Sequence, residues 1–506
     1  MAVTSESASL WRSYLNHPHP AFGGLWAAPG AVEISEIPQG EMKMTEKSFD
    51  IAILGGGPGG YTAAIRAAQL GMTVALVEKG FLGGTCLNRG CIPSKAFIRC
   101  ASLLEDIKGA KTFGVSASDV SFDWSKILKY KDRCVIRLRK GTESLMPKNK
   151  IEVFSSNGVL TSVDMIQTDQ ITVKAKNIIL ATGSVPRSLP SLPVDGEFII
   201  NSDHALELSS LPKSLLVVGA GAIGCEFAYV MSVLGVDATI VEFLDRALPM
   251  EDEEISKEYE SELKRRKIKL YVRSSVEKIE MITGGVRSHV KPRDGGEEFT
   301  IDAEKVLVSV GRKAASENCG LEEAGIPIEK GFVKVDGFMK TGVGNIRAIG
   351  DLVGGLMLAH KAAAEGILAV EDIAGIQRLP LKYANIPRAT YTRPEVASVG
   401  YNESEARIIY GEKVRIGKFP FTALAKAFVH GHTTGFVKFI AAGDEGKLVG
   451  AHAIGANATD LIAIASTAIG SGLTAEDFAH IVQAHPTLGE IWHEAAHGCL
   501  DGTINF

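Results

Sequence analysis

The sequence predicts an α/β protein that contains two copies of one strand–turn–helix–strand unit, at residues 49–78 and 215–242. Each copy begins with a short apolar run, passes through a glycine-rich turn into a helix-like stretch, and ends in a glutamate after a second apolar run. Five pairs of positions correspond at a constant spacing of 164 residues (219 − 55 = 164): Gly55 and Gly219, Gly57 and Gly221, Gly60 and Gly224, Gly71 and Gly235, and Glu78 and Glu242. Two units in register are stronger evidence for this architecture than one glycine motif.

The glycine pattern of each unit is typical of a Rossmann-like domain that binds a dinucleotide. The first glycine permits a tight turn, the second lets the backbone approach a pyrophosphate, and the third lets helix and strand pack closely. The helix start offers unpaired N–H groups to the phosphates, and Glu78 and Glu242 stand where a carboxylate accepts hydrogen bonds from ribose hydroxyls. Glu242 would also repel a 2′-phosphate and favours NAD over NADP, although Arg246 is nearby. A lone glycine motif is often only a turn, but the pair in register predicts two bound dinucleotides.

The composition is that of an ordinary globular enzyme with several domains. The chain has 506 residues, of which 45% are hydrophobic and 22% are charged, with a formal net charge of -5. It has no basic stripe of the kind that binds nucleic acid. The best candidate for a membrane span, residues 461–473, is short and interrupted by small polar residues, so we expect a buried helix there and no membrane association.

The cysteines and the N-terminal segment indicate the compartment. Seven cysteines scattered over a long chain do not resemble a secreted disulfide framework, which favours the cytoplasm or another reducing compartment. Residues 1–43 contain four prolines and two basic residues besides histidine, which fits neither a secretory signal nor a transit peptide. We expect a poorly ordered extension over residues 1–45, with Met42 and Met44 as alternative starts.

Two cysteines, Cys86 and Cys91, follow the first unit five positions apart. On an ideal helix this spacing is about 7.5 Å along the axis, whereas a disulfide needs Cα atoms within about 7 Å. A bridge therefore requires a local distortion, which Gly90 would permit, and a distorted bridge is readily reduced. Two free thiols remain an alternative. Half of a metal site is another, but no second cysteine or histidine cluster is evident, and we expect no metal.

The segment that holds this pair resembles the redox-disulfide segment of the pyridine nucleotide–disulfide oxidoreductases, and among them the dihydrolipoyl dehydrogenases. It reads Gly83-Gly84-Thr85-Cys86-Leu87-Asn88-Arg89-Gly90-Cys91-Ile92-Pro93-Ser94-Lys95. The resemblance extends from about residue 49 to the C-terminal region through five further stretches: 179–183, 310–312, 348–351, 394–400 and 485–490. It implies that the first unit binds FAD and the second binds NAD, and that Cys86 and Cys91 form the redox disulfide.

The resemblance also implies roles for residues outside the glycine turns. Asp351 would hydrogen-bond the ribityl or pyrophosphate region of FAD, although it could be an ordinary loop aspartate. Lys95 and Glu226 would form an ion pair beside the flavin ring, where each alone would pass for a surface charge. The remaining cofactor contacts that it implies are Thr85, Gly183, Gly311 and Ala359.

A candidate acid–base pair lies near the C-terminus. Residues 487–490 have the form of a helix capping box, so Glu490 could serve a helix start and His485 could be an ordinary loop histidine. By the resemblance, His485 is the acid–base catalyst and Glu490 orients it. A thiol of pKa about 8.5 is mostly protonated near neutrality, so a base is needed to form the attacking thiolate. In the family this histidine reaches the disulfide of the partner subunit, which implies a homodimer.

The expected fold has two Rossmann-like domains and an α+β C-terminal dimerisation domain. The predicted boundaries are 46–193 for the FAD domain, 194–315 for the NAD domain, 316–386 for a segment completing the FAD domain, and 387–506 for the interface domain. The resemblance implies oxidation of dihydrolipoyl groups on an acyltransferase or carrier protein. Another flavin disulfide reductase and a catalytically silent flavoprotein scaffold are the alternatives. Gln483 and Arg347 depart from the residues common in relatives.

Overall fold

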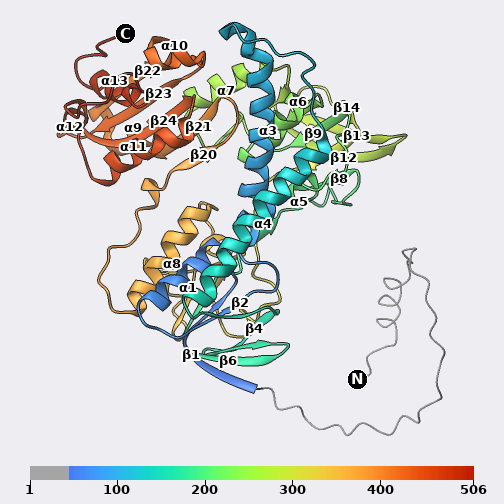
Figure 1. The fold of residues 1–506 in the computed structure, drawn as a ribbon, viewed down its shortest axis with the longest axis vertical. Helices are drawn as coiled ribbons and strands as arrows, with labels where there is room; N and C mark the ends of the chain where they lie inside the picture. The colour runs from blue at the N-terminus through green and yellow to red at the C-terminus, as the bar shows by residue number, and fades with distance from the viewer. Residues whose placement is uncertain (1–44) are drawn as a thin grey trace. The chain divides into compact units, whose positions relative to one another are not determined.

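The computed structural model describes residues 45–506 (Figure 1). The extension expected over residues 1–45 therefore lies outside the described residues, except for Thr45, which begins the first strand. The α/β architecture predicted from the repeat is confirmed. The described chain contains two sheets with parallel strands, each with its own glycine turn, and one antiparallel C-terminal sheet. The domain boundaries stay a prediction.

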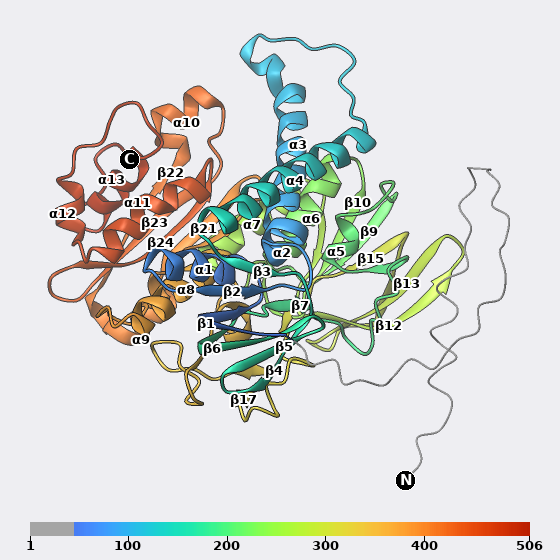
Figure 2. The ribbon, with the colours of Figure 1, turned by 60° about the horizontal axis from the view of Figure 1, so that its bottom comes forward.

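The first sheet carries the first repeat unit. Its strands, in spatial order, are β3 (Glu152–Phe154), β2 (Val74–Val77), β1 (Thr45–Leu54), β6 (Ile171–Leu180), β5 (Met165–Thr168) and β4 (Gly158–Ser162), with β19 (Ile346–Ala348) also paired to β6. Alternate residues of β1 face opposite sides. Ile51 and Ile53 pack beneath α1 (Pro58–Gln69) and α8 (Ala359–Ile373), which lie side by side in Figures 1 and 2. Ala52 and Leu54 belong to a second apolar cluster on the opposite face, so this end of β1 is buried on both sides.

The second sheet carries the second repeat unit. Its strands, all joined in parallel, are β11 (Lys269–Tyr271), β10 (Asp237–Val241), β9 (Ser214–Val218), β15 (Lys305–Val308) and β8 (Ile199–Ile200). The associated helices are α5 (Ser202–Ala205), α6 (Ala222–Val233) and α7 (Glu253–Arg265). An antiparallel ribbon packs on this sheet through β12 (Ser274–Ile282), β13 (Gly285–Pro292) and β14 (Phe299–Ala303). Helix α6 is almost wholly buried because it lies between this sheet and α3.

Three helices carry the cysteine segment and the helical arm that follows it: α2 (Gly84–Arg89), α3 (Cys91–Gly109) and α4 (Trp124–Lys148). Helix α3 packs against both α4 and α6, so the cysteine segment is anchored to the second repeat unit as well as to the first. The smaller elements are η1 (Ala110–Phe113), β7 (Ser184–Pro186), β16 (Arg312–Ala314), β17 (Ile328–Glu329), β18 (Phe332–Val333), η2 (Gly350–Val353) and η3 (Tyr383–Asn385).

The C-terminal region is an antiparallel sheet with helices. Its strands, in spatial order, are β20 (Arg388–Thr390), β21 (Glu395–Gly400), β24 (Lys447–Gly455), β23 (Phe436–Ala442) and β22 (Val414–Pro420). The helices are α9 (Glu403–Tyr410), α10 (Ala425–His430), α11 (Ala458–Gly470), α12 (Ala475–Ala479) and α13 (Glu490–Gly498), with single turns η4 (Gly411–Lys413) and η5 (Phe421–Ala423). Helix α11 packs on the sheet, as expected of the apolar run there. Within residues 45–506, no helix has the length and apolarity needed to cross a membrane.

Candidate redox active site

The two glycine turns have the same geometry. Gly55 has φ +110° and Gly219 has φ +106°, in the region that disfavours other residues. A Cβ on Gly60 would lie 1.8 Å from the carbonyl oxygen of Gly55, and a Cβ on Gly224 would lie 2.0 Å from that of Gly219. The first and third glycines are therefore required for the turn and for close packing of helix on strand.

The second glycine of each turn faces open space instead. A Cβ on Gly57 would meet nothing closer than the Cα of Gly84 at 4.0 Å, and a Cβ on Gly221 would meet nothing within 4 Å. Helices α1 and α6 begin directly after these glycines, so their unpaired N–H groups border the same space. This arrangement fits a pyrophosphate at each helix start.

The acidic residues of the two units also correspond in their contacts. Glu78 accepts hydrogen bonds from the N–H of Gly56 and of Gly80, both at 2.7 Å. Glu242 accepts from Ala220 at 2.5 Å and from Leu244 at 2.8 Å, positions again 164 residues later (220 − 56 = 164). Each carboxylate is thus fixed across its turn, and each oxygen keeps a lone pair for a ribose hydroxyl. This bracing role was not predicted from the sequence.

Arg246 is the basic residue near Glu242 that could have favoured NADP over NAD, and its side chain has local partners. Its Nη1 lies 3.6 Å from Oδ2 of Asp245, and its Nη2 donates to the carbonyl oxygen of Pro249 at 3.4 Å. The buried Glu242 carboxylate is therefore the charge fixed at the end of β10. A fixed negative charge there disfavours a 2′-phosphate.

Cys86 and Cys91 lie on two different helices that meet at Gly90. Helix α2 ends at Arg89 and α3 begins at Cys91, so the distortion expected between the cysteines is a helix break. A Cβ on Gly90 would lie 3.0 Å from the carbonyl oxygen of Thr85 and 3.5 Å from the Cα of Cys86. Glycine therefore permits the close approach of the two helix ends.

Both cysteines are free thiols that hydrogen-bond to each other. The hydrogen bond from Cys86 is the main reason why the pKa of Cys91 is lowered to about 7, with the Lys95 ammonium assisting against burial. The same hydrogen bond, together with burial, raises the pKa of Cys86. In the reduced pair, Cys91 is therefore the sulfur that loses its proton more readily, and Cys86 is the one that keeps it.

Lys95 and Glu226 form the ion pair that the resemblance implies. The Lys95 ammonium lies 2.9 Å from both carboxylate oxygens of Glu226, one turn along α3 from Cys91. Glu226 is buried in α6 and also accepts the N–H of Tyr391 at 3.0 Å. The Lys95 ammonium lies 4.4 Å from the centre of the Tyr391 ring. The pair joins the cysteine helix to the second repeat unit and to the start of the C-terminal region.

Asp351 lies on η2, at the carboxyl end of β19. Its Oδ2 accepts the hydroxyl of Ser184 at 2.5 Å. Arg312 donates through Nε to the same hydroxyl at 2.6 Å, and its Nη2 lies 3.5 Å from the Thr85 hydroxyl. Arg312 therefore links the residue beside Cys86 to the aspartate turn, a role that was not predicted. The only sequence signal was its place at the end of the 310–312 stretch.

The other implied cofactor contacts lie at backbone positions. Gly183 and Gly311 have φ of +75° and +101°, and a Cβ on either would meet nothing within 4 Å. Ala359 is the first residue of α8. These positions leave backbone accessible to a ligand, as Gly57 and Gly221 do. Among the residues described, no group of three His, Cys, Asp or Glu side chains is arranged to hold a metal ion.

His485 and Glu490 form the expected hydrogen-bonded pair. The Nδ1 of His485 lies 2.8 Å from Oε1 of Glu490, while Oε2 accepts the N–H of Thr487 at 2.7 Å. The expected capping box is only half formed, because the Thr487 hydroxyl donates to Ala484 at 2.8 Å rather than to the helix. The His485 side chain is 70% exposed. Within residues 45–506 it has no hydrogen bond to Cys86 or Cys91 of the same chain.

The two departures have local partners. Arg347 lies buried in β19, and its Nη2 lies 2.5 Å from Oδ2 of Asp372 on α8. Gln483 is half-buried, and its side-chain amide donates to the carbonyl oxygen of Ile481 at 3.4 Å. Arg347 is therefore a packing ion pair, and neither residue joins the contacts of the predicted site.

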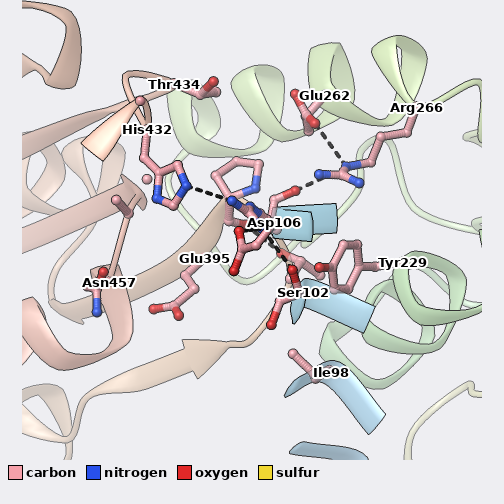
Figure 3. Close-up of a pocket in the computed structure, with 16 residues that line it drawn as sticks. Ile98, Ser102, Asp106, Tyr229, Glu262, Arg266, Glu395, His432, Thr434 and Asn457 are labelled. Carbon is pink, nitrogen blue, oxygen red and sulfur yellow. Dashed lines mark hydrogen bonds and ion pairs between the residues drawn. The ribbon is translucent and has the colours of Figure 1, made fainter. Parts of the chain in front are cut away.

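A separate cavity of about 350 Å³ borders α3, α6 and the C-terminal sheet (Figure 3). Two ion pairs line it: Arg393 lies 2.7 Å from Asp106, and Arg266 lies 2.9 Å from Glu262. His432 also contacts Arg393, at 2.6 Å (Figure 3). None of the predicted site residues lines this cavity.

Comparisons with known proteins agree with this geometry. Residues 49–366 match the family described as pyridine nucleotide-disulphide oxidoreductase, and residues 386–496 match its dimerisation domain. The chain is 42% identical over 471 residues to a dihydrolipoyl dehydrogenase of Bacillus subtilis (strain 168), which covers 90% of this chain and 99% of that protein. It is 40% identical to the mitochondrial dihydrolipoyl dehydrogenase 2 of Arabidopsis thaliana, over 90% and 91% of the two chains.

A solved structure gives the same result for the fold. The crystal structure of LpdA from Mycobacterium tuberculosis superposes with a TM-score of 0.83 at 27% sequence identity, and the match covers 90% of this chain and 99% of that one. The matched regions include both glycine turns, the cysteine helices and the His485–Glu490 pair. The chain therefore belongs to the pyridine nucleotide-disulphide oxidoreductase family, whose dimerisation domain it also carries.

Proposed function

We propose that this protein is a dihydrolipoyl dehydrogenase, which oxidises dihydrolipoyl groups and reduces NAD. The observation that carries the proposal is the pair of cysteines, Cys86 and Cys91, brought together at a helix break beside the first glycine turn and next to Lys95. The curated relatives named dihydrolipoyl dehydrogenase support the choice of substrate.

His485 would accept the proton of the substrate dithiol. Its Nδ1 is engaged by Glu490, so Nε2 is the nitrogen that can take a proton. The Glu490 carboxylate would stabilise the imidazolium that results. Because His485 is exposed and has no hydrogen bond to the cysteines of its own chain within residues 45–506, it would act on the cysteines of the partner in a homodimer.

The sulfur chemistry follows from the two different cysteines. In the oxidised protein, a substrate thiolate attacks Cys86, the Cys86–Cys91 bond breaks, and Cys91 leaves with the electron pair as a thiolate. The second substrate sulfur then closes the lipoyl disulfide and displaces Cys86, which takes the first proton from His485, while the proton of the second substrate thiol passes to His485 in its place. The Lys95 ammonium lies close to Cys91 and stabilises the departing thiolate, which makes Cys91 the better leaving group.

The cofactors would bind at the two glycine turns. The first turn, with Glu78 and Asp351, would hold FAD, and the second, with Glu242, would hold NAD. Bound FAD would accept the electron pair of the reduced cysteines and pass it to NAD as a hydride. The remaining residues proposed to contact FAD are Thr85, Gly183, Gly311 and Ala359.

The partners and the compartment belong to the same proposal. The dihydrolipoyl group would be carried by an acyltransferase or carrier protein of a 2-oxo acid dehydrogenase or glycine-cleavage complex. The scattered cysteines favour the cytoplasm, where thiols stay reduced.

The test measures NADH formation from dihydrolipoamide and NAD by the purified, FAD-loaded protein, with glutathione disulfide and NADPH assayed in parallel. We expect turnover of dihydrolipoamide and loss of that turnover in Cys86→Ser. Cys100→Ser, which alters a half-buried cysteine on α3 outside the pair, is the matched control and should remain active. Preferential turnover of glutathione would support another reductase of the family. If dihydrolipoamide fails to reduce the bound flavin under anaerobic conditions, the result would support a catalytically silent flavoprotein scaffold.

A further inference from the structure

Two oppositely charged side chains of α8 lie completely buried one turn apart. Lys361 is 1% exposed and Glu365 is 0% exposed, and the ammonium lies 3.3 Å from Oε1 of Glu365. A buried ion pair is costly unless its remaining hydrogen-bonding groups are also satisfied. The other partners of this pair are therefore informative.

The other contacts of Lys361 go to η2, the turn that carries Asp351. Its ammonium donates to the carbonyl oxygens of Gly350 at 3.0 Å and Gly354 at 2.8 Å. With Glu365 these acceptors match the three N–H donors of the ammonium. Glu365 in turn accepts the N–H of Gly350 through Oε2 at 2.7 Å. The pair thus holds the turn on both sides of Asp351.

The turn depends on this support because of its backbone conformation. Gly350 has φ +75° and Gly354 has φ +74°, so both ends of the turn lie in the left-handed region. A Cβ on Gly350 would lie 3.3 Å from the Cβ of Ala362 on α8, which shows how closely the turn lies on that helix. The carbonyl groups of the turn would be buried without partners if the ammonium were removed.

We propose that Lys361 and Glu365 are positioning residues for FAD, because they hold η2 so that Asp351 can receive a hydrogen bond from the cofactor. The Oδ2 of Asp351 is occupied by the Ser184 hydroxyl, which leaves Oδ1 for the ligand. With its backbone held by α8 and one oxygen held by Ser184, the Asp351 carboxylate is preorganised. This inference rests on the proposed flavin role of Asp351.

Tyr383 extends the same network to the linker between α8 and the C-terminal sheet. Its hydroxyl donates to Oε1 of Glu365 at 2.8 Å, from the single turn η3. Burial, with the nearby Glu365 carboxylate, raises the pKa of Tyr383, so the phenol stays a donor at neutral pH. Because Glu365 keeps its bonds to Lys361 and Gly350 without it, Tyr383→Phe should weaken FAD binding less than Glu365→Gln.

The test compares FAD affinity in full-length variants. Apo-protein is titrated with FAD, and quenching of flavin fluorescence gives the dissociation constant. We expect Lys361→Met and Glu365→Gln to weaken FAD binding by roughly tenfold or more. The visible circular dichroism of the flavin that does bind should change as well, because it reports the surroundings of the ring system. The matched control is Lys131→Met on α4, where a lysine 2% exposed donates to the carbonyl oxygen of Leu206 at 3.1 Å.

The outcomes separate three explanations. Weaker FAD binding in the α8 variants, with Lys131→Met within about threefold of the unmodified protein, supports the proposal. Unchanged FAD affinity in Lys361→Met overturns it, and so does an equal loss in Lys131→Met, which would indicate general destabilisation. Should Lys361→Met fail to fold, Glu365→Gln decides by the same criterion, because it preserves volume and one acceptor. An unmodified protein that binds no FAD overturns the proposed function, and this inference with it.

Discussion

The hydrogen bond between the two thiols can be tested through the reactivity of Cys91. In the structure this bond is the largest cause of the lowered pKa of Cys91, which falls from an ordinary value of 9.0 to about 7. Burial acts in the opposite direction, and Lys95 alone offsets only part of it. Cys86→Ala removes the donor and leaves the effects of burial, Lys95 and Glu226 in place. The pKa of Cys91 should therefore return to about 9 or above.

The size of the effect follows from this difference. A change of two pKa units corresponds to about 2.7 kcal/mol of preference for the thiolate. At pH 7 the thiolate fraction of Cys91 should fall from about one half in the unmodified protein to about one in a hundred in Cys86→Ala. Since the thiolate is the reactive form, the alkylation rate of Cys91 should fall by a similar factor. In the unmodified protein the rate should decrease as pH falls through 7.

The assay is alkylation of the reduced protein with iodoacetamide across a pH series, with Cys91 followed by peptide mass spectrometry. Cys86→Ser is the matched control, because its hydroxyl keeps a donor and should give a smaller shift than alanine. An unchanged midpoint for Cys91 in Cys86→Ala would refute the reasoning, since the lowered pKa would then have another cause. A midpoint near 9 in the unmodified protein would refute it equally.

Three further variants test other parts of the structure. Gly221→Val places a side chain in the open side of the second turn. It should raise the KM for NAD by about tenfold or more, while the FAD content stays unchanged. An unaltered KM would contradict the assignment of that turn to NAD. Glu490→Gln removes the charge beside His485 and should lower kcat by about tenfold to a hundredfold. Circular dichroism spectra would check that the variant is folded. Full activity would mean that the carboxylate is not needed. Arg347→Met should lower the free energy of unfolding, measured in urea, by about 2 kcal/mol, because Asp372 loses a buried partner. The kcat should stay the same. A large fall in kcat would instead indicate that Arg347 takes part in the reaction.

The parts of the site that lie close together in sequence were predictable. The turns at Gly55 and Gly219 need positive φ values that glycine adopts easily, and the break at Gly90 needs a close approach of two helix ends that glycine permits. The pairing of Lys95 with Glu226 joins residues 131 positions apart, and it was predicted only through the family resemblance. No local pattern distinguishes these two charges from surface residues.

In the structure, Glu490 both contacts His485 and caps a helix start, two roles that appeared as alternatives in the sequence. One carboxylate oxygen contacts His485 and the other accepts the N–H of Thr487. The second bond belongs to the helix start, and it also fixes the orientation of the carboxylate that faces the histidine. The two roles therefore cooperate, which the spacing of the residues alone could not show.

The network around Asp351 was beyond sequence reasoning for a physical reason. Lys361 and Glu365 are four residues apart on a helix, a spacing typical of an exposed ion pair worth a few tenths of a kcal/mol. Whether that face of α8 is exposed to water depends on where η2 lies. The position of η2 is set in turn by the pairing of β19 with the first sheet. The same spacing of a lysine and a glutamate therefore fits both a surface ion pair and a buried one, and the sequence does not distinguish them. Since their ammonium and carboxylate groups are satisfied mainly by the backbone of one turn, the proposed flavin contact of Asp351 depends on how well η2 and α8 fit each other.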